Sequence, residues 1–287
     1  KIPLLQDKLK RRFGLRDAIV IPTDQDCSLL LKNLAKAAAD YFEKIVPARA
    51  SVALGGGYLM YEMVARLPER HRDIDIYPAA IVGRGPSITH IDPMTLVTLL
   101  WAKSGHGQGR AHYITLTPPE IGSGFESLAR YYGEFQKRKQ VKPLLASMNN
   151  VDFVFASVGG IDASEAYLAV TRDMTKNLLD EMNLGAANRN KPKSASTNAS
   201  QLSEAGAVGD LAYSFFDAEG RTKSEWNLAT SIGIKRLKEL SSTPDKAVVV
   251  VVGGYKEQSL NAVMQGRICN VLITDADGAE QALKDHL

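Results

Sequence analysis

The sequence is poor in the features that mark several large classes of protein. It has two cysteines, Cys27 and Cys269, and no Cys-x-x-Cys motif, which excludes a disulfide-stapled fold. No apolar run approaches the ~20 residues that a membrane-spanning helix needs. A formal net charge of +3 is too small to argue that this chain itself binds nucleic acid. We therefore expect a globular protein of a reducing, cytoplasmic compartment.

Motifs for metals, nucleotides and catalytic nucleophiles are also missing. The five histidines show no paired spacing with carboxylates or cysteines. The glycine-rich stretches match neither Gly-x-Gly-x-x-Gly nor the Walker pattern with its Lys-Ser/Thr, and no Gly-x-Ser-x-Gly occurs. We expect no bound metal and no cofactor.

Short apolar runs alternate with helical periodicity along the chain. This alternation predicts an α/β protein with a parallel, doubly wound sheet. A polar stretch at 185–205 is predicted to be a loop, and the helix expected from 125 is interrupted near Pro143. The predicted strands are 18–22, 51–54, 74–82, 112–116, 151–158, 211–216, 247–252 and 270–274, and the predicted helices are 2–13, 29–46, 58–67, 94–103, 125–145 and 257–265.

The end of the chain carries the strongest indication of a binding site. A β-branched run at 247–252 reads as a strand buried on both faces, and Gly253-Gly254 follows it. The glycines allow a tight turn and leave a helix N-terminus open to an anion. Lys256 then supplies a cation at the carboxyl end of the strand, where open α/β sheets bind their ligands. As an alternative, Lys256 is a solvated lysine in the first helical turn.

A second glycine turn, Gly55-Gly56-Gly57, also joins a predicted strand to a predicted helix, which begins at Tyr58. Its amides and the helix dipole could cradle a phosphate. A tight, closely packed turn explains the same glycines equally well.

Three further polar residues lie next to the ends of predicted strands. Asp210 and Asp217 flank the strand predicted at 211–216, and a carboxylate there can bind sugar hydroxyls; Asp217 is better explained as a turn residue, so Asp210 is the site candidate. Arg84 follows the predicted strand 74–82 at its carboxyl end, a position that favours a ligand contact.

Two blocks of this sequence resemble the effector-binding domain of SorC-type bacterial transcriptional regulators. One is AVVVVVGGYKEQSLNAVMQGRICNVLITD at 247–275, with its strand, Gly-Gly-x-x-Lys turn, helix and Thr-Asp ending. The other is Gly-Ala-Val-Gly-Asp at 206–210 followed by Phe-Phe-Asp-x-x-Gly at 215–220. Leu54 to Gly57 agrees more loosely. The resemblance extends over nearly the whole chain.

This resemblance implies a fold, a ligand and partners. The fold is the Rossmann-like three-layer doubly wound sheet shared with sugar-phosphate isomerases, glucosamine-phosphate deaminases and CoA transferases. The implied ligand is a small sugar, most often phosphorylated, and the site residues are Gly55, Gly56, Gly57, Tyr58, Arg84, Asp210 and Lys256. Family members often carry threonine where this chain has Tyr58, so an unphosphorylated sugar stays open. The protein would be a homo-oligomer and not an enzyme. All 287 residues would form the sensor, and the helix-turn-helix domain that contacts operator DNA would be absent from this chain.

Two other functions remain open from the residues alone. A sugar-phosphate isomerase or deaminase on the same scaffold would need a general base, for which Asp210 is the candidate. A nucleotide- or nucleotide-sugar-binding module is the weaker alternative, because the glycine pattern does not support it.

Overall fold

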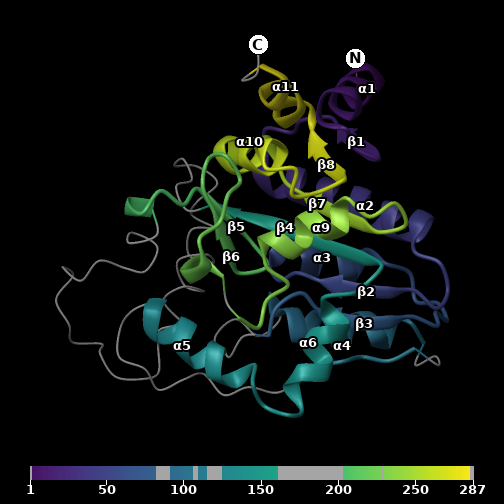
Figure 1. The fold of residues 1–287 in the computed structure, drawn as a ribbon. Coiled ribbons are helices and arrows are strands. Elements are labelled where there is room, and N and C mark those ends of the chain that lie inside the picture. Colours follow the sequence, from purple (N-terminus) through teal and green to yellow (C-terminus); the bar gives the residue numbers. More distant parts are fainter. Residues whose placement is uncertain are drawn as a thin grey trace, which may run out of the picture.

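The computed structural model describes residues 2–81, 91–105, 109–114, 125–160, 203–227 and 229–284. Within them a sheet runs in the order β1-β8-β7-β4-β2-β3, with every pair along this path parallel (Figure 1). A hairpin, β5–β6, pairs antiparallel with the far end of β4. The strands are β1 Asp17–Ile21, β2 Ser51–Leu54, β3 Asp75–Pro78, β4 Phe153–Gly160, β5 Gly209–Leu211, β6 Ser214–Phe216, β7 Ala247–Val251 and β8 Val271–Asp275.

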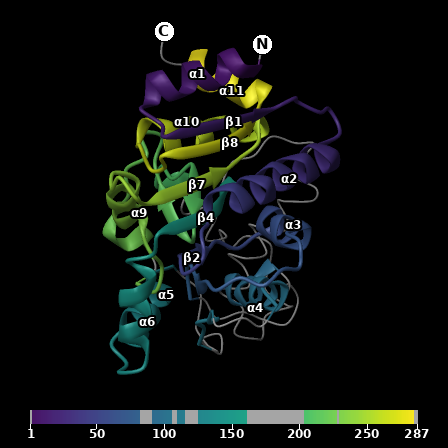
Figure 2. The ribbon, with the colours of Figure 1, turned by 90° about the vertical axis from the view of Figure 1, so that its right-hand side faces the viewer.

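Helices cover both faces of the sheet, which gives three layers (Figure 2). One face packs against α2 Cys27–Ile45, α3 Tyr58–Arg66 and α4 Pro93–Lys103. The other face packs against α1 Ile2–Phe13, α6 Val141–Met148, α9 Ile234–Ser241, α10 Glu257–Gln265 and α11 Ala276–Lys284, with the end of α5 Phe125–Phe135.

Side chains along each central strand alternate between these two cores. In β7, Val248 and Val250 enter one core, while Val249 and Val251 enter the other. All five residues of β7 are buried, as the β-branched run predicts for a strand covered on both faces. The expectation of a mostly parallel α/β sheet flanked by helices is therefore confirmed.

The strand order places a topological switch point between β2 and β4. The chain leaves β2 through α3 toward β3, whereas β7 lies on the opposite side of β4. Doubly wound sheets bind their ligands at the carboxyl ends of the strands on either side of such a switch point.

Several predicted boundaries were wrong. The strand predicted at 211–216 is the hairpin β5–β6, and the strand predicted at 112–116 is, in its described part, only extended chain beside a single bridge from Ala111 to Ile76. Helices α5 and α6 are separated at 136–140, whereas Pro143 lies in the first turn of α6, where no helical N–H is lost. Val82, residues 115–116 and most of 185–205 lie outside the described residues.

Helix starts follow the sequence closely. Asp26 caps α2 by accepting the amides of Ser28 and Leu29, and Asp92 caps α4 by accepting the amide of Met94. In the part of the chain that the structure describes, no helix is both long and apolar enough to cross a membrane.

Candidate ligand-binding site

The carboxyl end of β4 is the centre of the candidate site. Ser157, Val158 and Gly159 are consecutive there, and each faces a different segment. Ser157 Oγ donates to the carbonyl of Gly56 over 3.3 Å, and the carbonyl of Val158 accepts from Lys256. Gly159 in β4 pairs with Asp210 in β5. One strand end therefore brings together three segments that lie far apart in sequence.

The Gly55–Gly57 turn is closely packed, as expected if its glycines serve a tight turn between strand and helix. A Cβ at Gly56 would lie 2.9 Å from Pro93 Cδ, and Gly57 has a φ of 107°, which side chains disfavour. Two of the three amides are already used, because Gly55 donates to Phe155 and Gly57 donates to Ile91. These two amides cannot cradle a phosphate in this conformation.

The N-terminus of α3 is the better anion site beside this turn. Its N-cap is Gly57, which offers no side-chain cap to the first-turn amides. The positive end of the α3 dipole therefore lies beside Ser157 at the carboxyl end of β4. The glycines bring the backbone of β2, α3 and β4 close together, and the helix supplies the N–H groups.

Lys256 is not the solvated lysine of the alternative interpretation. It lies at the N-cap of α10, is only partly exposed, and its Nζ donates to the carbonyl of Val158. Its ammonium also lies 5.8 Å from the centroid of the Tyr255 ring. These contacts hold the cation against the end of β4, beside the candidate anion site.

The second glycine pair, Gly253-Gly254, was predicted to leave a helix N-terminus open to an anion, but the structure shows a different role. The amide of Gly254 donates to Asp275 Oδ1 over 2.6 Å, so an internal carboxylate occupies this turn. A Cβ at Gly254 would lie 2.5 Å from the amide nitrogen of Gly278. Gly254 therefore permits α11 to pack closely, and Lys256 is the residue of this turn that reaches the site.

Asp210 reaches the site through the hairpin. Its Oδ2 accepts the amide of Tyr213 over 3.2 Å, and its Oδ1 would lie 1.8 Å from a Cβ at Gly159. The hairpin turn is Ala212-Tyr213, and both residues have positive φ, at 50° and 61°. Asp210 thus stabilises a strained two-residue turn while its carboxylate lies over the end of β4.

Burial perturbs both charged groups of the site. Desolvation raises the pKa of Asp210 to about 6, although the Tyr213 amide and Lys256 oppose the shift. Desolvation lowers the pKa of Lys256 to about 8, although Asp210 opposes that shift. Both side chains are partly exposed, yet the surrounding protein excludes much of the water that would otherwise hydrate their charges. At neutral pH the site is a close pair of opposite charges that a polar ligand would solvate.

The other predicted residues are placed less directly. Tyr58 is half-buried, and a hydrogen bond to Glu62, together with burial, raises the pKa of its phenol. Its hydroxyl is thus held along α3. Arg84 lies outside the described residues. Asp217 accepts the amides of Glu219 and Arg221, which confirms its role in a turn.

The sequence analysis missed Ser157 and Gly159 as site residues. The glycine pair Gly159-Gly160, which directly follows the predicted strand 151–158, was the available signal. No cluster of histidine, cysteine and acidic side chains suited to a metal occurs among the described residues.

Comparison with known proteins places this geometry in a family. The profile of the family described as "Putative sugar-binding domain" matches residues 3–188 and 184–284. The chain is 22% identical over 289 residues to the central glycolytic genes regulator of Bacillus subtilis, covering 99% of this chain and 72% of that protein. It is 25% identical over 287 residues to the protein of the same name from Priestia megaterium, covering 98% and 72%.

Solved structures agree in fold. A DeoR family transcriptional regulator from Listeria monocytogenes superposes with a TM-score of 0.73 at 18% identity, covering 98% of this chain and 99% of that one. The full-length sorbitol operon regulator SorC from Klebsiella pneumoniae gives 0.72 at 17% identity, covering 99% and 81%. These relatives are transcriptional regulators and not enzymes. The chain belongs to the family of sugar-binding domains found in SorC- and DeoR-type transcriptional regulators, which confirms the resemblance seen in its sequence.

Proposed function

We propose that this chain is the effector sensor of a sugar-responsive regulator and that its ligand is a small phosphorylated sugar. The phosphate would lie between the N-terminus of α3 and the ammonium of Lys256, and the sugar hydroxyls would bond Asp210 and Ser157. Tyr58 and Arg84 would complete the site, as the family resemblance implies. The scaffold would be the three-layer fold shared with sugar-phosphate isomerases, glucosamine-phosphate deaminases and CoA transferases.

One observation supports this proposal most strongly, the gathering of three segments at the end of β4. An uncapped helix N-terminus and a partly desolvated lysine favour an anion. The carboxylate of Asp210 favours hydroxyl donors on the same ligand. A sugar phosphate combines both chemistries in one small molecule.

The ligand would act by changing how subunits associate. We propose a cytoplasmic homo-oligomer in which ligand binding favours one arrangement of the subunits. This arrangement would change the affinity of a helix-turn-helix domain outside this chain for operator DNA. Sedimentation with and without ligand tests this step, and a strict monomer in both conditions would contradict it.

A thermal-shift screen tests the ligand class. Each sugar phosphate is paired with its unphosphorylated sugar, and every hit is repeated on Lys256→Met and on Lys235→Met. Lys235 is an exposed lysine in the first turn of α9, so its loss is a matched control. A ligand at about a hundred times its Kd stabilises the folded state by about 2.7 kcal/mol, which raises the Tm by about 5 °C.

The expected result is a shift that needs both the phosphate and Lys256 and survives Lys235→Met. An equal shift with the free sugar would show that the phosphate is not recognised. A shift that Lys256→Met leaves unchanged would place the ligand elsewhere.

A further inference from the structure

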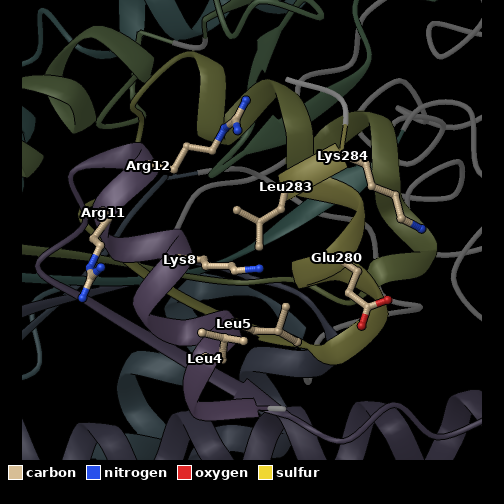
Figure 3. A pocket seen from close by; sticks show the side chains of 8 residues that line it. All are labelled: Leu4, Leu5, Lys8, Arg11, Arg12, Glu280, Leu283 and Lys284. Atoms are coloured by element: carbon tan, nitrogen blue, oxygen red, sulfur yellow. The ribbon is translucent and has the colours of Figure 1, made fainter. Parts of the chain in front are cut away.

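A concave surface lies at the β1 edge of the sheet, where α1 packs on β1. It is a groove of about 640 Å³ between α1 and α11 (Figure 3). The two helices pack side by side near the two ends of the chain (Figure 1). Helix α1 has 12 residues and rises about 18 Å.

Leucines form the floor of this groove. Leu4 and Leu5 come from α1, and Leu283 comes from α11. Leu5 is turned to the core at 7% exposure, whereas Leu4 is 58% exposed, the most exposed large apolar side chain among the described residues. An apolar floor that remains open to water is typical of a surface that another molecule covers.

Basic side chains form the rim. Lys8, Arg11 and Arg12 continue the helical face that begins at Leu4, and Lys284 lines the groove from α11. All four are exposed, and Figure 3 shows Lys8 extending from α1 toward α11. Among the described residues that line the groove, Glu280 is the one with a carboxylate. The groove therefore presents leucine between flanks of positive charge.

This combination discriminates between occupants. A second copy placed symmetrically on the groove would oppose each basic rim with an identical one, which is unfavourable. A nucleic acid would satisfy the cations, but its charged phosphates offer no apolar surface to cover the leucine floor. A helix with an apolar stripe and acidic flanks satisfies both floor and rim.

We propose that the α1–α11 groove binds an acidic amphipathic helix of a protein partner. Leucine-like side chains spaced three and four residues apart enter between α1 and α11, and glutamates or aspartates on their flanks pair with the basic rim. The partner helix lies next to α1 and α11, alongside the edge of the sheet, and binds independently of the ligand site.

Fluorescence anisotropy with designed peptides tests the proposal. The probes are acidic amphipathic peptides of about 14 residues that vary in leucine spacing, the same peptides with every glutamate changed to lysine, and acidic peptides without leucine. The protein variants are Leu4→Ser and Arg11→Glu. Lys10→Glu is the matched control, because Lys10 lies on α1 but pairs with Asp7 and does not line the groove. All three sites are on the surface of α1.

We expect saturable binding of at least one acidic amphipathic peptide, weakened about tenfold or more by Leu4→Ser and by Arg11→Glu and little changed by Lys10→Glu. Added salt weakens it further. Equal binding of the leucine-free acidic peptides, equal loss with Lys10→Glu, or no binding by the whole panel would overturn the proposal. So would sedimentation showing that Arg11→Glu dissociates a dimer, since the occupant would then be a second copy.

Discussion

Replacing Lys256 by methionine separates the stability of the apo protein from its ability to bind a ligand. Methionine keeps an unbranched side chain of similar length and removes the charge. The ligand-induced stabilisation should disappear, because the cation at the end of β4 is lost. The apo protein should nevertheless remain about as stable as the wild type.

The size of this effect follows from the pKa of Lys256. A fall from its ordinary 10.5 to about 8 corresponds to about 3 kcal/mol against the charged form, and the exposed part of the side chain reduces this to about 2 kcal/mol. The lost hydrogen bond to the Val158 carbonyl offsets about 1.5 kcal/mol. The free energy of unfolding at pH 7 should therefore change by less than about 1 kcal/mol.

The pH dependence gives a sharper readout. The folded protein releases the Lys256 proton at a lower pH than the unfolded chain does, so wild-type stability rises between about pH 8 and 10.5. Lys256→Met should lack this rise, whereas Lys235→Met should keep it. Urea denaturation across this range measures the difference. An apo variant destabilised by more than about 2 kcal/mol at pH 7, or one that keeps the alkaline rise, would refute the argument.

Three further predictions concern other parts of the site and the core. Asp210 binds its proton more tightly in the folded protein, with a pKa of about 6 against an ordinary 3.8, so wild-type stability should fall as the pH rises through that interval, and Asp210→Asn should lose this dependence in urea titrations. Gly159→Ala should destabilise by about 1–3 kcal/mol in the same assay and weaken ligand binding, since its Cβ would meet Asp210 at 1.8 Å; Gly133→Ala, with no atom within 4 Å of its Cβ, should not. A thiol reagent should modify Cys27 and spare Cys269, whose burial raises its pKa to about 12, until the protein unfolds; mass spectrometry showing two labels on the native protein would contradict this.

The hairpin shows where sequence reasoning failed. A two-residue turn of this kind needs positive φ at both positions, and the usual signal is asparagine or glycine. Here the turn is Ala212-Tyr213, held partly by the carboxylate of Asp210, which lies two residues before it. The local sequence therefore predicts one continuous strand. It gives no sign of the hydrogen bond from the Tyr213 amide to Asp210 that supports the turn.

The two glycine turns show a subtler failure. Both were correctly placed between a strand and a helix, but glycine alone does not say whether its N–H is free. The partners that consume these amides, Ile91 and Asp275, come from other segments of the chain. Only the folded protein shows that the amides of Gly57 and Gly254 are already bonded and that Lys256 Nζ lies at the end of β4.

The sequence by itself determined the class of fold, the buried parallel strands, most of the helices and the family. These follow from local periodicity, capping residues and motifs that lie within short stretches of chain. Tertiary structure alone decided the strand order, and with it the switch point between β2 and β4. It also brought Ser157, Gly159, Asp210 and Lys256 to one strand end and left Leu4 uncovered beside α11. Those outcomes depend on contacts between segments far apart in sequence, which no local pattern encodes.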